Sequence, residues 1–169
     1  MNTRRPECES KQRHTIPIPV NNVFDPTTVA GLTSRINSLT PATIPQWGKM
    51  SVDQMLAHVN VPYEMVYENK HPKPSWLMRL VLRAIVKNKV VGPAPYPQNS
   101  PTAPVFRMKG AKDFALEQQR LLDFLKRVQS DGERTFEGKR SDSFGPLTAA
   151  EWNVMFYKHL DHHLTQFGV

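Results

Sequence analysis

The chain has 169 residues, which is the usual length of one domain and suffices for a single hydrophobic core. Its composition, 39% hydrophobic and 22% charged residues, is ordinary for a soluble globular protein. The formal charge of +7 favours anionic partners such as nucleic acid, anionic metabolites or an acidic membrane surface, although a solvated basic surface is the simpler interpretation.

Residues 1–22 are polar apart from the extended stretch "IPIPV", and we expect a flexible tail that is either disordered or strapped along the surface. A single domain is expected at residues 23–169. The only cysteine, Cys8, excludes an intramolecular disulfide and a cysteine-based metal cluster. No secretory signal is visible, and no apolar run approaches the length of a membrane span, so the default expectation is a cytoplasmic protein.

Two amphipathic helices are predicted in the first part of the chain. Residues 25–39 can begin with Asp25 as the N-cap, and apolar residues then recur every three or four positions. Residues 50–68 open with a capping box formed by Ser51 and Gln54, and they carry a wide apolar arc. Both segments are therefore expected to pack one face against a core.

Residues 74–91 form a third predicted helix, which is strongly apolar and carries a basic stripe of Arg79, Arg83 and Lys87. Such a helix can lie on a membrane surface, but the preferred interpretation is a helix packed on a bundle with its stripe outward. Its apolar surface would suit a dimer interface. Residues 92–104 contain five prolines and no periodicity, which predicts a long loop that is functional or covers something.

Two more helices are predicted in the second half. Residues 112–130 show the clearest apolar face, and Asp131-Gly132 is expected to end that helix. Residues 148–167 open with a second capping box of Thr148 and Glu151. Since no strand pattern competes, the sequence predicts an all-α fold, a four-helix bundle with one extra helix or irregular segment.

The last predicted helix holds three of the six histidines within five positions: His159, His162 and His163. Residues four apart share a helix face with Cβ atoms roughly 5–6 Å apart, so His159 and His163 can bind one metal ion. The pair at spacing three, His159 and His162, offers an alternative. On a helical wheel of about 100° per residue the apolar arc is centred near His163, whereas His162 falls toward its edge.

His58 on the segment 50–68 faces inward, or nearly so, and is the third candidate ligand. Three neutral histidines leave at least one coordination position open, which is typical of catalytic rather than structural sites. Histidines that only form hydrogen bonds in a core are the alternative, and the pattern alone does not decide between the two. Gln166 is a candidate for orienting a ligand or substrate, with Glu64 and Asp161 as weaker candidates.

Two segments resemble the DinB/YfiT-like superfamily. The stretch "KHLDHHLTQF" contains its H-x-x-H-H-x-x-Q pattern at His159, His162, His163 and Gln166. The stretch "WGKMSVDQMLAHV" resembles its second-helix segment, with Trp47 before the helix and His58 at the metal-binding position. The stretches "QNSPTAP" and "SFGPLTAAEW" are similar to one uncharacterised branch, and the resemblance covers roughly residues 24–168.

The resemblance implies an up-down-down-up four-helix bundle, often a homodimer, with a divalent metal such as nickel, zinc or iron on His58, His159 and His163. It also implies metal-dependent chemistry, including transfer or isomerisation with a low-molecular-weight thiol. The resulting hypothesis is an enzyme of transferase, isomerase or hydrolase type that activates a thiol or water for a small-molecule substrate.

The alternative hypothesis is a non-catalytic bundle, metal-stabilised or metal-free, that binds a small molecule or a partner protein. Whether the chain is an enzyme therefore stays open at this level. Nucleic-acid binding ranks last because the sequence contains no recognisable binding motif and little aromatic interleaving.

Overall fold

The computed structural model describes residues 21–169, most of which are helical. The long helices are α1 (Pro26–Asn37), α2 (Val52–Tyr67), α5 (Phe114–Phe136) and α6 (Ala149–Gln166). Between α2 and α5 lie α3 (Trp76–Val81), the π-helical turn η1 (Leu82–Val86), α4 (Lys87–Val91) and the 3-10 turn η2 (Pro104–Phe106). This content agrees with the predicted all-α class, while residues 1–20 of the tail predicted at residues 1–22 lie outside the described residues.

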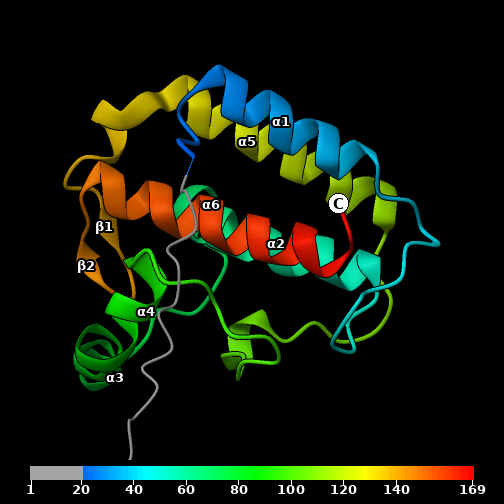
Figure 1. The fold of residues 1–169 in the computed structure, drawn as a ribbon. Helices are drawn as coiled ribbons and strands as arrows, with labels where there is room; N and C mark the ends of the chain where they lie inside the picture. Colours follow the sequence, from blue (N-terminus) through cyan, green and yellow to red (C-terminus); the bar gives the residue numbers. More distant parts are fainter. Residues whose placement is uncertain (1–20) are drawn as a thin grey trace, which may run out of the picture.

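The four long helices pack around a hydrophobic core, with α1 alongside α5 and with α6 next to α2 (Figure 1). Tyr63 of α2 is at the centre of this packing and is only 2% exposed. Its ring stacks on Phe124 of α5 at 5.6 Å and on Phe156 of α6 at 4.7 Å between centroids. The stack fixes α2 against α6, the two helices that carry the candidate metal ligands.

The predicted helix starts are confirmed by their caps. Asp25 accepts hydrogen bonds from the backbone N–H groups of Thr27 and Thr28, and both predicted capping boxes are present at Ser51 and Thr148. The predicted helix end at Asp131-Gly132 is present as a break, since Gly132 leaves helical geometry with a φ of 69°. One further helical turn, which the sequence did not predict, runs to Phe136, whose side chain is fully buried in the core.

The segment 74–91 is helical, but its predicted orientation is wrong. The side chains that pack against the core are Leu82, Val86, Val90 and Val91, whereas most of the other apolar side chains are exposed. The basic stripe is only partly directed outward: Lys87 forms an ion pair with Glu151 of α6 at 2.8 Å, and Arg83, although exposed, borders Gly145 of the segment before α6. An apolar pattern shows that a helix has an apolar face but not which partner covers it.

A short hairpin, which the sequence did not predict, precedes α6. Strand β1 (Arg140–Ser141) pairs antiparallel with β2 (Gly145–Pro146), so that Arg140 lies opposite Pro146. Two-residue strands are too short to show an alternating pattern. Within residues 21–169, none of the helices has the length and hydropathy needed to cross a membrane.

Candidate metal centre

Helices α2 and α6 bring together three histidines: His58, His159 and His163. One ring nitrogen of each lies within 4.8 Å of those of the other two. The Nε2 atoms of His58 and His159 are 3.0 Å apart. This distance suits two ligands at about 2.0–2.1 Å from one shared ion, and it also suits a single N–H···N hydrogen bond. His58 and His163 are buried, and His159 is half-buried.

The surrounding protein fixes which nitrogen carries the proton in two of these rings. Nδ1 of His58 lies 2.8 Å from the carbonyl oxygen of Phe106, which can only accept, so this nitrogen donates. Nδ1 of His163 lies 2.8 Å from Oε1 of Gln166, and Nε2 of Gln166 donates to the carbonyl of Trp47 at 2.7 Å. Since the Trp47 carbonyl can only accept, the amide nitrogen of Gln166 must face it, and the amide oxygen must face His163. Nδ1 of His163 therefore donates to that oxygen. Both rings therefore keep a lone pair on Nε2.

The cluster is neutral at physiological pH. Burial lowers the pKa of His58 and lowers the pKa of His163 to about 3. Burial and the neighbouring imidazoles also hold the pKa of His159 well below its ordinary value. Neutral imidazole is the form that ligates metals.

Internal hydrogen bonding cannot satisfy this cluster completely. His58 and His163 each present an Nε2 lone pair, and the neutral ring of His159 has one N–H that it can donate to only one of them. A divalent cation shared by the three rings satisfies all of the lone pairs, so the residues present fit a metal ion.

His162 is not a member of this group of three. Its ring is half-buried and packs edge-on against Trp47 at 6.0 Å and against Tyr96 at 5.7 Å between centroids. The structure thus places His162 beside the cluster, as the helical wheel predicted.

The two carboxylates considered as orienting groups are engaged elsewhere. Glu64 is buried and binds Lys70, His71 and Arg120. Asp161 forms an ion pair with Arg35 of α1 at 2.6 Å. Neither carboxylate hydrogen-bonds to a histidine of the cluster, whereas the sequence suggested that they could orient a ligand. Both are instead bound to basic side chains outside the cluster. Gln166, by contrast, hydrogen-bonds to Nδ1 of His163 at 2.8 Å.

The proline-rich loop between α4 and α5 covers the cluster. The ring of Phe106, at its end, lies 5.5 Å from His58 and 5.8 Å from His159 between centroids. The ring of Tyr96 lies 6.4 Å from His159. The loop thereby supplies an aromatic cover in addition to the Phe106 carbonyl that accepts from His58.

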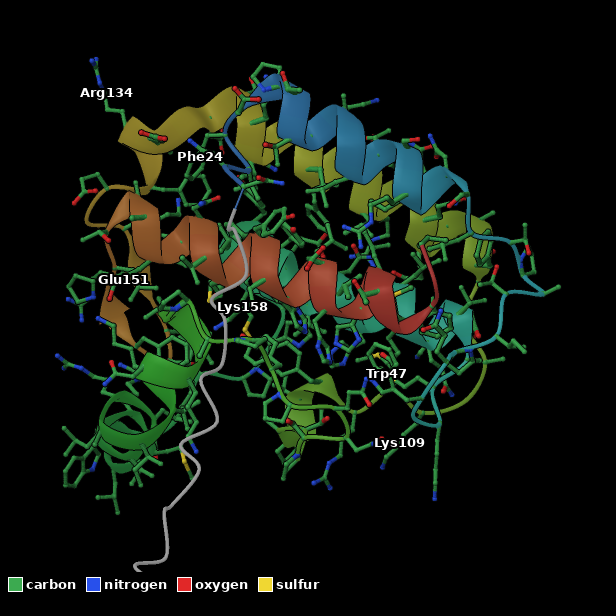
Figure 2. The ribbon with its side chains drawn as sticks, viewed as in Figure 1. Phe24, Trp47, Lys109, Arg134, Glu151 and Lys158 are labelled. Atoms are coloured by element: carbon green, nitrogen blue, oxygen red, sulfur yellow. The ribbon has the colours of Figure 1, made fainter. Side chains whose placement is uncertain are left out.

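Lys158 of α6 holds this loop in place. In Figure 2, Lys158 is labelled on the side of α6 that faces the loop. Its side chain is buried, and Nζ donates to the carbonyls of Lys89, Gly92 and Ala94. Nζ also lies 4.5 Å from the centroid of the Tyr96 ring. Burial lowers the pKa of Lys158 to about 8, so the ammonium form predominates at pH 7.

Sequence reasoning missed Phe106, Tyr96 and Lys158, since their roles depend on the path of a loop without periodicity. Gly48 carried a weak signal because it follows Trp47 just before α2. It has a φ of 84°, and a Cβ atom there would come within 2.6 Å of Nε2 of Gln166. Glycine at this position lets the backbone approach Gln166, which in turn orients His163.

Comparisons of the chain with curated proteins and with solved structures gave no match. One family model, described as "Protein of unknown function (DUF1569)", matches residues 27–168. The match includes His58, His159, His163 and the loop that covers them. The chain therefore belongs to the DUF1569 family of proteins of unknown function.

Proposed function

We propose that His58, His159 and His163 hold a divalent metal ion and that the chain is a metal-dependent enzyme acting on a small molecule. The observation that carries the proposal is the convergence of three neutral imidazoles, two of which have their Nε2 lone pairs fixed by protein acceptors on Nδ1. The packing of α1, α2, α5 and α6 supports a DinB/YfiT-like four-helix bundle as the scaffold.

The proposed reaction class is transfer, isomerisation or hydrolysis. A divalent ion with an open position supplies Lewis acidity that lowers the pKa of a bound thiol or water. The residues of the chain orient and shield this site. Gln166 and the Phe106 carbonyl fix the rings of His163 and His58, and the rings of Phe106 and Tyr96 limit the access of water.

Metal content tests the proposal directly. Protein purified without chelators is expected to contain close to one equivalent of nickel, zinc or iron by elemental analysis, and the apoprotein should bind one equivalent on titration. Protein that carries no transition metal and binds none would contradict the enzyme hypothesis. It would leave the non-catalytic bundle as the function that fits.

Two matched variants test the ligand assignment. His163→Ala is expected to abolish stoichiometric metal binding, because it removes one of three ligands. His162→Ala, a change of the same kind one residue away, is expected to retain it. Equal loss of binding in both variants would overturn the choice of ligands.

The open coordination position has its own test. Substitution with Co²⁺ gives a visible spectrum that reports on the ligands, and addition of a low-molecular-weight thiol is expected to change that spectrum. The same thiol added to His163→Ala protein treated with Co²⁺ should give only the spectrum that Co²⁺ and the thiol give without protein. A spectrum of the wild-type protein that does not respond to thiols would favour water as the activated group.

A further inference from the structure

The basic charge of the chain is concentrated in one segment. Residues 69–112 contain nine Lys and Arg residues and no Asp or Glu. The other residues contain 13 basic and 15 acidic side chains, so the segment carries +9 and the remainder −2, which together give the formal charge of +7. The segment comprises α3, η1, α4 and the loop over the histidine cluster.

The same segment exposes most of the large apolar side chains of the surface. Of the eight that are exposed in residues 21–169, six lie between Trp76 and Ile85. Trp76 is 74% exposed, Ile85 60% and Leu77 58%. In Figure 1, α3 lies at the periphery of the molecule, away from α1 and α5. Exposed large apolar side chains gathered on one segment in this way are typical of an interaction site.

A pocket of about 290 Å³ joins these two features. It lies between α3, η1 and the β1–β2 hairpin, and its lining includes Trp76, Leu80, Arg79, Arg83, Arg140 and Asp142. In the described part of the chain, Arg83 and Arg140 form no ion pair with a carboxylate. Two guanidinium groups without a counter-ion, beside an exposed indole ring, match a ligand that is anionic at one end and apolar at the other.

We propose that the segment Trp76–Val91 and this pocket form a docking surface for membranes that contain anionic phospholipids. The lipid phosphate would occupy the arginine pocket, and Trp76, Leu77 and Leu80 would enter the interfacial region. Basic helices with exposed Trp and Leu lie in membrane interfaces in this way. The inference does not depend on the metal site.

Charge and hydropathy together favour a lipid over other occupants of this surface. A second copy of the chain docked through the same surface would bring two segments of like charge together, which opposes association. Nucleic acid would use the arginines, but it offers no partner for exposed aliphatic side chains such as Leu77 and Ile85. An anionic membrane satisfies both sets of side chains.

Vesicle flotation with the full chain tests the proposal. Binding is expected to vesicles of phosphatidylcholine with roughly one third phosphatidylglycerol, to weaken as salt rises, and to be much weaker with phosphatidylcholine alone. Arg83→Gln should reduce binding about fivefold, and Trp76→Ser about tenfold or more. Both side chains are exposed, so neither variant should impair folding, and circular dichroism checks this.

Matched controls lie on α5, outside the proposed surface. Lys126→Gln removes an exposed positive charge, and Leu116→Ser removes an apolar side chain that is 56% exposed. Both controls should bind vesicles as the wild type does. The proposal is overturned by absence of binding, by equal binding to neutral vesicles, or by equal losses in the controls. A dimer in sedimentation analysis that is lost in Trp76→Ser would instead assign the surface to a second copy.

Discussion

The side chain of Gln166 connects the histidine cluster to the segment before α2. Its Oε1 accepts from His163 and its Nε2 donates to the Trp47 carbonyl. Replacing it by leucine removes the acceptor that fixes the orientation and the protonated nitrogen of His163. Removal of a group that orients a ligating histidine typically weakens metal binding by about 10–100-fold. Gln166→Leu should therefore raise the Kd for the metal by about that factor. Competitive titration against a chelator measures it.

Gln118→Leu is the matched control for this prediction. The Gln118 amide donates to the Ile36 carbonyl at 2.8 Å, away from the histidine cluster, so its loss should leave metal affinity unchanged. If Gln166→Leu bound metal as tightly as the wild type, the proposed role of Gln166 in orienting His163 would be wrong.

The carboxylate of Glu64 predicts a dependence of stability on pH. Burial raises the pKa of Glu64, but hydrogen bonds from Lys70, His71 and Arg120 outweigh burial and hold it below the ordinary 4.5. Because the pKa of Glu64 is lower in the folded state, its carboxylate stabilises the protein at pH values above its pKa in the unfolded chain. This stabilisation is lost as the pH falls through the folded-state pKa. Glu64→Gln should therefore lower the free energy of unfolding by about 2 kcal/mol at pH 7.

Urea unfolding between neutral and acidic pH checks this sign. The difference between wild type and Glu64→Gln should shrink toward zero as the pH falls below the folded-state pKa of Glu64. Glu133→Gln, which removes an exposed carboxylate bound to Asn22, should change stability by less than about 0.5 kcal/mol. A difference that persists unchanged in acid would show that Glu64 stabilises the fold by packing rather than by charge.

At the scale of single residues, spacing on a helix carried most of what the sequence revealed about the site. His159 and His163 belong together because they lie four apart on one helix, and His58 because it faces inward on α2. The partners of Glu64 and Asp161 could not be predicted from the sequence, because they depend on how the helices that carry Arg120 and Arg35 pack. Periodicity predicts which face of a helix a side chain lies on, but it does not predict which side chain of another helix it contacts.

At the scale of elements, the same reasoning explains the success for four helices and the error for Trp76–Val91. Helices α1, α2, α5 and α6 bury a wide apolar face, so periodicity identifies both the helix and its inner side. The segment Trp76–Val91 has more apolar residues than one face can hold, and the π-helical turn at Leu82–Val86 changes the angular spacing along it. Its inner face was therefore not determined by its own sequence.

The loop over the cluster depends on one buried lysine. Lys158→Met keeps the length of the side chain but removes hydrogen bonds to three loop and helix carbonyls. A charged hydrogen bond of this kind contributes about 1.5–3 kcal/mol, so the opening equilibrium of the loop should rise roughly 10–100-fold. Hydrogen exchange followed by mass spectrometry should show faster exchange at residues 94–106. Lys126→Met, an exposed lysine on α5, is the control and should leave that exchange rate unchanged.

At the scale of the whole molecule, the proposed ion would link α2 to α6 through histidines 101 positions apart. An ion that binds only the folded chain stabilises it by about 2.7 kcal/mol at a free concentration of 100 times Kd. For a protein of this size that corresponds to an increase in Tm of roughly 5–11 °C. Calorimetry of apo and metal-loaded protein measures the increase.

The readout that separates metal bridging from packing is the difference between the two Tm values of each variant. His58→Ala and His163→Ala leave cavities and should lower the Tm of the apoprotein, but their metal-dependent increase should disappear because a ligand is missing. His162→Ala should retain the full increase. An increase that persists in both ligand variants would mean that the ion binds elsewhere and does not join α2 to α6.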